Sequence, residues 1–228
     1  MKSRREQSER SRSRILAVSL ELFRKRGFDR TTMRDIAKAA GTSLGAAYYY
    51  FPSKEAIVLS YYEELVESFE ARAREVFERT PDLRERLRGV FHAKLDLARR
   101  DRKLMAALSR TVGDSQSAVS VFAARTRPIR ERTIGVMRQA VSVPEVPETL
   151  RELSALGLWT LLLAVLIYFI HDGSPKQERT RRLVDHAIEL LLPLVPLFSM
   201  PEIFSFREQL AALLEDAGLV ETPAPKSD

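Results

Sequence analysis

Hydrophobic positions recur at helical spacing along nearly the whole chain. Leu16, Leu20 and Phe23, for example, share one face of a helix expected over about 11–26. Apolar residues spaced three and four positions apart form one face of an α-helix, whereas alternating positions would form a strand. Convincing alternation is found nowhere, and most glycines and prolines stand between helical runs. The pattern predicts an all-α protein of about nine to ten helices.

Two short helices separated by a glycine turn should follow the first helix. Gly27 can adopt the left-handed conformation that ends a helix. Thr32 and Asp35 have the spacing of a capping box, so the second helix should begin there. Its apolar face repeats at i, i+3, i+4 and i+7 and consists of Met33, Ile36, Ala37 and Ala40. Gly41 should end it after two turns, and a third helix should span about 43–50.

Longer helices should fill the rest of the chain. Ser53 is positioned to cap a long helix whose apolar stripe includes Ile57, Tyr61, Leu65 and Phe69. Further helices are expected over 80–99, 102–112, 115–142, 148–170, 176–198 and 202–217, with bends or breaks at Pro128, Pro193 and Pro196. We therefore expect three parts: residues 1–54, a larger helical domain over 55–200, and a C-terminal helix with a disordered tail over 201–228.

Positive charge is concentrated in the first part. The whole chain carries a formal net charge of +6, but residues 1–54 contain thirteen Lys and Arg against five Asp and Glu. A basic head on a mildly acidic body is typical of a module that contacts phosphates. A solvated, tag-like tail remains an alternative explanation for the cations of the first fourteen residues, which are Lys2, Arg4, Arg5, Arg10, Arg12 and Arg14.

Several functional classes find no support in the composition. The chain has no cysteine, so it can form neither a disulfide nor a thiolate zinc site, which agrees with a cytoplasmic protein. No phosphate-binding glycine motif and no nucleophile elbow occur. His186 and Glu189 have a helical spacing that could share a metal, but such a pair is normally a solvated face. We expect no enzyme activity, no cofactor and no metal.

The segment Leu153–Ile170 has no formal charge and approaches the length of a membrane span. It contains Ser154, Gly157 and Thr160, and it lacks a flanking loop rich in Lys and Arg. We therefore interpret it as a buried or dimer-interface helix, with a membrane anchor as the alternative. The N-terminus has no apolar stretch before Ile15, so a signal peptide is not expected either.

The two short helices have the arrangement of a helix-turn-helix within the basic head. The N-terminal end of its second helix must bring small or hydrogen-bonding residues close to base edges, and its far end must hold phosphates. The first requirement is met by Thr42, Ser43, Gly45, Ala46 and Ala47. The second is met by Tyr48, Tyr49, Tyr50 and Lys54. Phe51 is expected to be a core residue, as is part of Tyr48.

The run RTTMRDIAKAAGTSLGAAYYYFPSKEAI, within about 15–62, resembles the TetR/AcrR family of bacterial transcriptional repressors. The resemblance implies that DNA contacts come from Thr31, Thr32, Thr42, Ser43, Leu44, Gly45, Ala46, Tyr48, Tyr49 and Lys54. Thr32 would bind a phosphate, the residues from 42 to 46 would face base edges, and Tyr48, Tyr49 and Lys54 would clamp the backbone. Over the remaining residues the resemblance is only architectural.

Three positions depart from the family pattern. Thr42 replaces a small aliphatic residue, Leu44 replaces a polar base reader, and Ala47 replaces a larger apolar residue. Leu44 cannot hydrogen-bond to a base and could contact only a thymine methyl group or fill space. The operator sequence is therefore not predictable from this helix.

The resemblance also implies a homodimer and a small-molecule effector. Dimer contacts are expected from the last two large helices, through Leu156, Trp159, Leu163, Leu183, Ala187 and Leu190, although about half of these could instead fill a monomer core. The effector pocket is expected among Phe91, Leu95, Met105, Phe122, Trp159 and Tyr168. Because the long apolar helix has little charge, we expect a largely apolar effector.

The leading interpretation is a cytoplasmic repressor that binds a palindromic operator on double-stranded DNA and is released by its effector. An activator or global regulator of the same family is an alternative, because repression depends on where the operator lies. A further alternative is a helical small-molecule-binding adaptor that does not bind DNA.

Overall fold

Helices make up almost all of the chain that the structure describes. The computed structural model describes residues 4–113 and 117–198, together with 200, 209, 212, 213 and 216. Within these ranges no strand occurs, which confirms the all-α prediction. The elements are α1 (Arg4–Arg26), α2 (Met33–Ala39), α3 (Leu44–Tyr50), α4 (Lys54–Arg79), α5 (Leu83–Gly113), η1 (Ala124–Thr126), α6 (Arg127–Ala140), α7 (Glu148–His171), η2 (Pro175–Gln177), α8 (Glu178–Leu191) and α9 (Leu194–Phe198). The helix expected over 202–217 lies almost wholly outside the described residues.

Local sequence signals determine how α1, α2 and α3 begin and end. Gly27 has φ +85°, and the ring centroids of Phe23 and Phe28 lie 5.2 Å apart across the end of α1. Thr32 and Asp35 form the expected capping box at the start of α2. The side-chain oxygens of Ser43 and Ser53 accept hydrogen bonds at the starts of α3 and α4. The predictions for Gly27, for the capping box and for Ser53 are confirmed.

The first hydrophobic core, here called the head core, joins these helices to α4 and α5. Its buried residues are Ile15, Leu16, Leu20, Phe23, Phe28, Met33, Ile36, Ala37, Ala40, Ala47, Phe51, Ile57, Val58, Tyr61, Leu104, Leu108 and Val119. The expected apolar face of α2 and the expected burial of Phe51 are thereby confirmed. Because α4 and α5 contribute to the head core, hydrophobic contacts cross the domain boundary expected after residue 54. That boundary stays a prediction.

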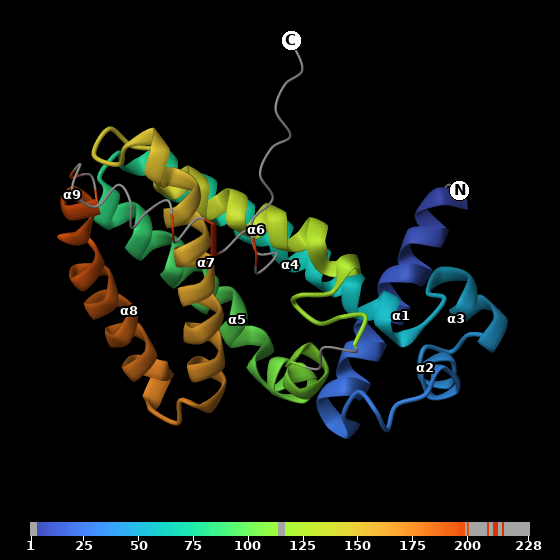
Figure 1. Ribbon diagram of the computed structural model, residues 1–228. Coiled ribbons are helices and arrows are strands. Elements are labelled where there is room, and N and C mark those ends of the chain that lie inside the picture. Colours follow the sequence, from blue (N-terminus) through green and yellow to red (C-terminus); the bar gives the residue numbers. More distant parts are fainter. Residues whose placement is uncertain are drawn as a thin grey trace, which may run out of the picture.

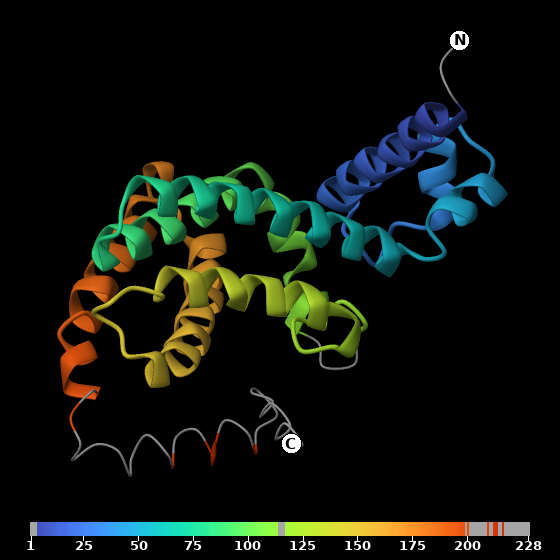
Figure 2. The same ribbon diagram turned by 90° about the horizontal axis from the view of Figure 1, so that it is seen from above.

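The second core, here called the body core, lies among α4, α5, α6, α7 and α8. Figure 1 shows these helices at one end of the molecule and α1, α2 and α3 at the other. In Figure 2 the long helix α4 runs from the head into the body. Phe69, Phe91, Leu95, Met137 and Phe169 are among the fully buried side chains of this core. α4 and α5 therefore connect both ends of the molecule.

Several helix boundaries differ from the sequence expectation, and α1 begins at Arg4, not near residue 11. The segments expected over 80–99 and 102–112 form one helix, α5, with a kink at Asp101, whose φ is −113° and ψ is 15°. Asp82, not Thr80, caps this helix, because Asp82 Oδ1 accepts a hydrogen bond from the Glu85 amide. α6 begins only at Arg127, with Pro128 in its first turn, because proline fits the start of a helix better than its middle.

The long apolar helix α7 packs inside the body. It is the one helix in the described ranges that is long and apolar enough to cross a membrane. Leu150, Ala155, Leu158, Leu162 and Phe169 of α7 are buried in the body core. This packing matches the expected buried helix along one face of α7, whereas Ile167 is 63% exposed on another.

A buried carboxylate fixes the corner between α7 and α8. Asp172 Oδ2 accepts hydrogen bonds from the amide and hydroxyl of Thr180, and Asp172 Oδ1 accepts one from the Ser174 amide. Arg102 of α5 donates to three carbonyl oxygens at the end of α7, those of Phe169, Ile170 and Asp172. Arg102 therefore holds the end of α7, and Asp172 holds the start of α8.

A close approach between α4 and α5 provides a test of this packing. A Cβ atom on Gly89 would lie 2.6 Å from Val76 Cγ1. We expect Gly89→Ala to destabilise the protein by about 1–2 kcal/mol, although alanine is the better helix former. Urea unfolding would measure this loss. Because Val76→Ala removes the obstructing methyl groups, Gly89→Ala should cost nothing in that background; equal costs in both backgrounds would contradict the packing.

Candidate nucleic-acid interface and internal cavity

The turn between α2 and α3 places one face of α3 in the core and leaves the other open. Gly41 has φ +61°, which permits the tight turn. The Thr42 amide then donates to the Ala37 carbonyl oxygen at 3.0 Å, and Ser43 accepts from the Ala46 amide at 3.1 Å. Ala47 is fully buried and anchors α3 on the head core. The other residues near the start of α3 are left for contact with a partner.

Large side chains are exposed on this open face. Tyr49 is 80% exposed, Tyr48 is 47% exposed and Leu44 is 37% exposed. Ser43 and Gly45 are exposed, and Thr42 and Ala46 are partly exposed. Aromatic side chains are rarely left open to water in such a group without a partner. The residues expected to face DNA are therefore together on one surface, with the exceptions described next.

Thr31 is not on this surface. Its side chain is fully buried, and its hydroxyl donates to the Gly27 carbonyl oxygen at 2.8 Å. The expected DNA contact through Thr31 is therefore wrong for this conformation, because the hydroxyl holds the loop after α1. The neighbouring Thr32 is exposed, but its hydroxyl donates to Asp35 Oδ2 at 2.6 Å as part of the capping box.

Lys54 holds the head together. Its ammonium donates to the carbonyl oxygen of Phe28 at 2.7 Å and lies 4.4 Å from the centre of the Phe28 ring. A weaker contact of 3.5 Å reaches the carbonyl oxygen of Asp29. An ammonium has three donors, so one is left for a phosphate. The backbone clamp expected at Lys54 stays a prediction, and the contacts with Phe28 and Asp29 add a structural role that the sequence did not indicate.

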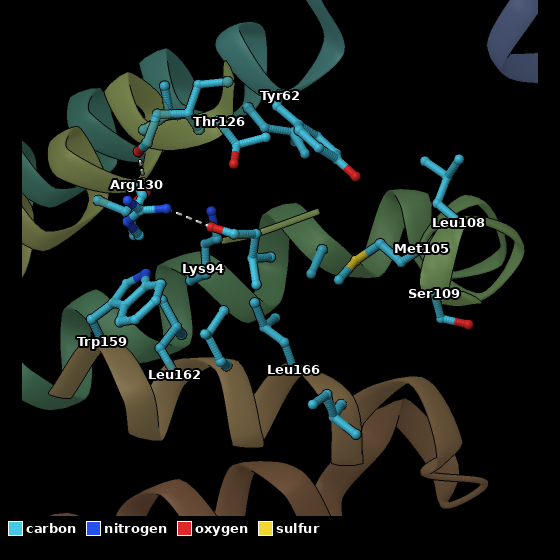
Figure 3. A pocket seen from close by; sticks show the side chains of 18 of the residues that line it. Tyr62, Lys94, Met105, Leu108, Ser109, Thr126, Arg130, Trp159, Leu162 and Leu166 are labelled. Carbon is cyan, nitrogen blue, oxygen red and sulfur yellow. Dashed lines mark hydrogen bonds between the residues drawn. The ribbon is translucent and has the colours of Figure 1, made fainter. Parts of the chain in front are cut away.

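A second candidate site is a cavity of about 560 Å³ between α4, α5, α6 and α7 (Figure 3). Three residues of the expected pocket, Met105, Phe122 and Trp159, line it. Phe91 and Leu95 are instead fully buried in the body core and do not line the cavity. Tyr168 is 43% exposed on α7 and does not line the cavity.

Polar groups that the sequence analysis missed also line this cavity. They include Tyr62, Lys94, Thr126 and Arg130. Lys94 had a recognisable signal, because it follows the apolar Phe91 by three positions and precedes the apolar Ala98 by four. A charge on the apolar face of a helix is unusual and marks a candidate site.

The residues expected at a dimer interface fall into two groups. Leu156 and Trp159 are buried within the protomer, and Leu163 lines the cavity. On α8, Leu183 is 44% exposed and Leu190 is 74% exposed, with Ala187 partly exposed between them. The α8 residues therefore form an apolar stripe on the surface, whereas the α7 residues serve the protomer's own interior.

The kink of α5 connects the cavity to the head. Leu108 lines the cavity and is also part of the head core. At the kink, Asp101 Oδ1 accepts a hydrogen bond of 2.5 Å from Arg24 at the end of α1. Burial, together with the nearby charge of Asp101, raises the pKa of the Tyr61 hydroxyl beside this ion pair. The cavity wall and the first helix thus share contacts.

Among curated proteins, the chain is similar to the HTH-type transcriptional repressor KstR2 of Mycobacterium tuberculosis. The two are 35% identical over 85 residues, which is 37% of this chain. The aligned part spans only 42% of the length of KstR2. The HTH-type transcriptional regulator TtgR of Pseudomonas putida is 36% identical over 70 residues, which covers 31% of this chain and 33% of that protein.

Solved structures share most of the fold at lower identity. A TetR-family transcriptional regulator from Syntrophomonas wolfei matches with a TM-score of 0.65 and 20% identity, over 80% of this chain and 95% of the other. The fatty acid degradation regulator FadR from Bacillus halodurans matches with a TM-score of 0.64 and 17% identity, over 78% and 94%. These likenesses show the fold.

Two family models match the chain. The model for bacterial regulatory proteins of the tetR family matches residues 15–61. The model for the tetracyclin repressor-like C-terminal domain matches residues 86–210, more than half of the chain. With the helix-turn-helix at one end and the helical body at the other, the chain belongs to the TetR family of DNA-binding transcriptional regulators, which are not enzymes.

Proposed function

We propose that this protein is a ligand-responsive repressor in the cytoplasm, which binds a palindromic operator as a homodimer and leaves it when an apolar effector fills the cavity. The observation that carries the proposal is that Leu108 both lines the cavity and packs in the head core. Packed interiors shift between discrete arrangements and transmit strain. A ligand that moves this part of α5 therefore moves the support of the helix-turn-helix.

DNA recognition is assigned to the open face of α3. The small residues from 42 to 46 allow the backbone to approach base edges in the major groove, where Leu44 contacts a thymine methyl group. Tyr48 and Tyr49 donate hydroxyl hydrogen bonds to phosphates, and Thr32 approaches a phosphate at the start of α2. The exposure of these side chains supports the assignment.

Dimerisation is assigned to the exposed side of α8, because the candidate residues of α7 are buried or line the cavity. α8 is held on α5 by ion pairs of Asp185 with Arg88 and of Arg181 with Asp96 at 2.5 Å, and by a hydrogen-bond contact of 2.9 Å between His92 and Asp185. Because these pairs fix one side of α8, the stripe of Leu183, Ala187 and Leu190 on its exposed side is available to a second copy. A symmetric pair would present two α3 helices to successive major grooves, about 34–36 Å apart.

The effector is proposed to be largely apolar and to act by population shift. Most cavity-lining residues are apolar, among them Leu65, Val66, Leu97, Leu162 and Leu166. The names of two similar proteins point to lipid-like compounds: KstR2 is a ketosteroid transcriptional regulator and FadR a fatty acid degradation regulator. To release DNA, the effector must bind the conformation with misplaced α3 helices more tightly than the DNA-binding one.

The experiment that tests DNA binding compares two exposed tyrosines over a salt series. We expect Tyr49→Ala to weaken binding to a selected operator by about tenfold, because a hydrogen bond to a charged phosphate is lost. The matched control is Tyr168→Ala, which removes a half-exposed tyrosine of α7 and should leave affinity unchanged. Fluorescence anisotropy would measure both variants, and the affinity of the unmodified protein should fall steeply with salt. A flat salt dependence, or equal effects of the two variants, would contradict the assignment.

A further inference from the structure

The charges that line the cavity are of one sign. Lys94 of α5 and Arg130 of α6 are among the lining residues, whereas Asp and Glu are absent from the described lining. Figure 3 shows both cationic side chains in the same part of the cavity as Thr126 and Trp159, with Met105 and Ser109 at the other end. The cavity is therefore polar and cationic in one region and apolar over the rest.

Of the two cations in the described cavity lining, Lys94 has no hydrogen bond to a protein group, whereas Arg130 has one. Its ammonium lies 4.6 Å from the centre of the Phe69 ring, and no carboxylate or hydrogen-bond acceptor in the described part of the chain pairs with it. Burial lowers the pKa of Lys94 to about 8. Lys94 is partly exposed, through the cavity that it lines. An unpaired ammonium in such apolar surroundings is costly, and an apolar residue of similar size would be more stable there. A lysine at this position is therefore better explained by binding to a ligand than by packing in the core.

Two other lining residues add donors to the cavity, Arg130 beside Lys94 and Tyr62 toward Met105 and Leu108 (Figure 3). The Tyr62 hydroxyl is buried and has no hydrogen-bond partner among the described residues. Arg130 uses one donor on the Val121 carbonyl oxygen at 2.9 Å, and its guanidinium has further N–H groups. A hydrogen-bond acceptor with negative charge would satisfy groups that the protein itself leaves unsatisfied.

The rest of the cavity has the shape for an elongated apolar molecule. On α7 the lining residues run from Trp159 to Ile170. At about 1.5 Å per residue, this stretch of helix is about 16 Å long. Met105 and Leu108 continue the apolar lining on α5 toward the head.

We propose that the effector is an elongated apolar molecule that carries a carboxylate, and that this carboxylate binds the Lys94 ammonium. The free N–H groups of Arg130 donate to the same carboxylate, and the apolar body extends along α7 to Met105 and Leu108, on the side toward which the Tyr62 hydroxyl points (Figure 3). This inference rests on the proposed function, because it specifies the chemistry of the ligand in the same cavity.

The test compares two ligands of equal chain length, decanoate and 1-decanol, by isothermal titration calorimetry on the full chain. We expect the unmodified protein to bind decanoate at least about tenfold more tightly than decanol. Lys94→Met should remove this preference and retain decanol binding. The matched control is Lys103→Met, on the exposed side of the same helix, which should keep the preference. Lys94→Met should also raise the melting temperature, because it removes an unpaired buried charge.

The pH dependence provides an independent measurement. Tyr61 and Tyr62 of α4 and Arg130 of α6 are the other titratable groups of the described lining, and the pKa values of both tyrosines are raised. Lys94 is thus the lining group that loses charge between pH 7 and 9. Decanoate affinity should fall over this range, while decanol affinity should not change.

The outcomes separate the two proposals. Equal affinity for decanoate and decanol, or a preference that survives Lys94→Met, would overturn the carboxylate assignment and leave the apolar cavity in place. Failure of both ligands to bind would overturn the apolar effector as well.

Discussion

Gly45→Glu should abolish operator binding while leaving the fold intact. Gly45 lies in the first turn of α3, is exposed, and has no atom within 4 Å of the position of an added Cβ. A glutamate there replaces a poor helix former and lies near the positive end of the helix dipole, so it should not destabilise the helix. On DNA, however, its carboxylate would face base edges and phosphates. A like-charge contact of this kind costs several kcal/mol, so affinity should fall at least about 100-fold.

The matched control for this prediction is Gly45→Gln, which has nearly the same size but no charge. We expect its loss of affinity to be at least about tenfold smaller, because only the steric part remains. Circular dichroism melting would show that both variants fold as well as the unmodified protein. If Gly45→Glu binds the operator normally, the start of α3 does not approach the DNA.

Asp172→Asn should destabilise the protein by about 2–3 kcal/mol at neutral pH. One carboxylate oxygen of Asp172 accepts two hydrogen bonds from Thr180, and the other accepts one from the Ser174 amide. An asparagine has only one acceptor oxygen, so a donor amide would face donors at the buried corner. The matched control is Asp82→Asn, which keeps a competent cap at the exposed start of α5 and should cost less than about 1 kcal/mol.

The same substitution should change how stability depends on pH. Burial by itself would raise the pKa of Asp172, but hydrogen bonds from Thr180 and Ser174 outweigh it and hold the pKa well below its ordinary value. A lowered pKa in the folded state stabilises the protein above the unfolded pKa, near about pH 4, and this stabilisation is lost as the pH falls. The advantage over Asp172→Asn should shrink by about 1.4 kcal/mol for each pH unit below about 4. Urea unfolding at pH 7 and pH 3 would measure it; a constant difference would contradict the role of the charge.

The helix-turn-helix was predictable because its signals are local. A capping box needs only Thr32 and Asp35, three positions apart, and Gly27 and Gly41 adopt the positive φ expected at helix ends. The structural contact of Lys54, by contrast, is a hydrogen bond to the carbonyl oxygen of Phe28, which lies twenty-six residues earlier in the sequence. A pattern of residue types does not show which residues far apart in the sequence meet in space. The structural role of Lys54 could therefore not be predicted from it.

The cavity was only partly predictable for the same reason. Periodicity shows which side of α5 is apolar, but it does not separate the wall of a cavity from a filled core. Phe91 and Leu95 were therefore expected beside a ligand and lie in the body core, whereas Met105 lines the cavity. The division depends on how α6 and α7 pack against α5, which only the three-dimensional arrangement determines.

The sharing of α5 between head and body limits how the protein can be rebuilt as a biosensor. A chimera joined at residue 54 would carry the reading helix but lose Leu104, Leu108 and Val119, which complete the apolar interior under it. The transplanted module would then expose that surface to water and lose the ion pair between Arg24 and Asp101. A chimera that keeps the response to ligand must therefore include the second half of α5 together with the DNA-binding module.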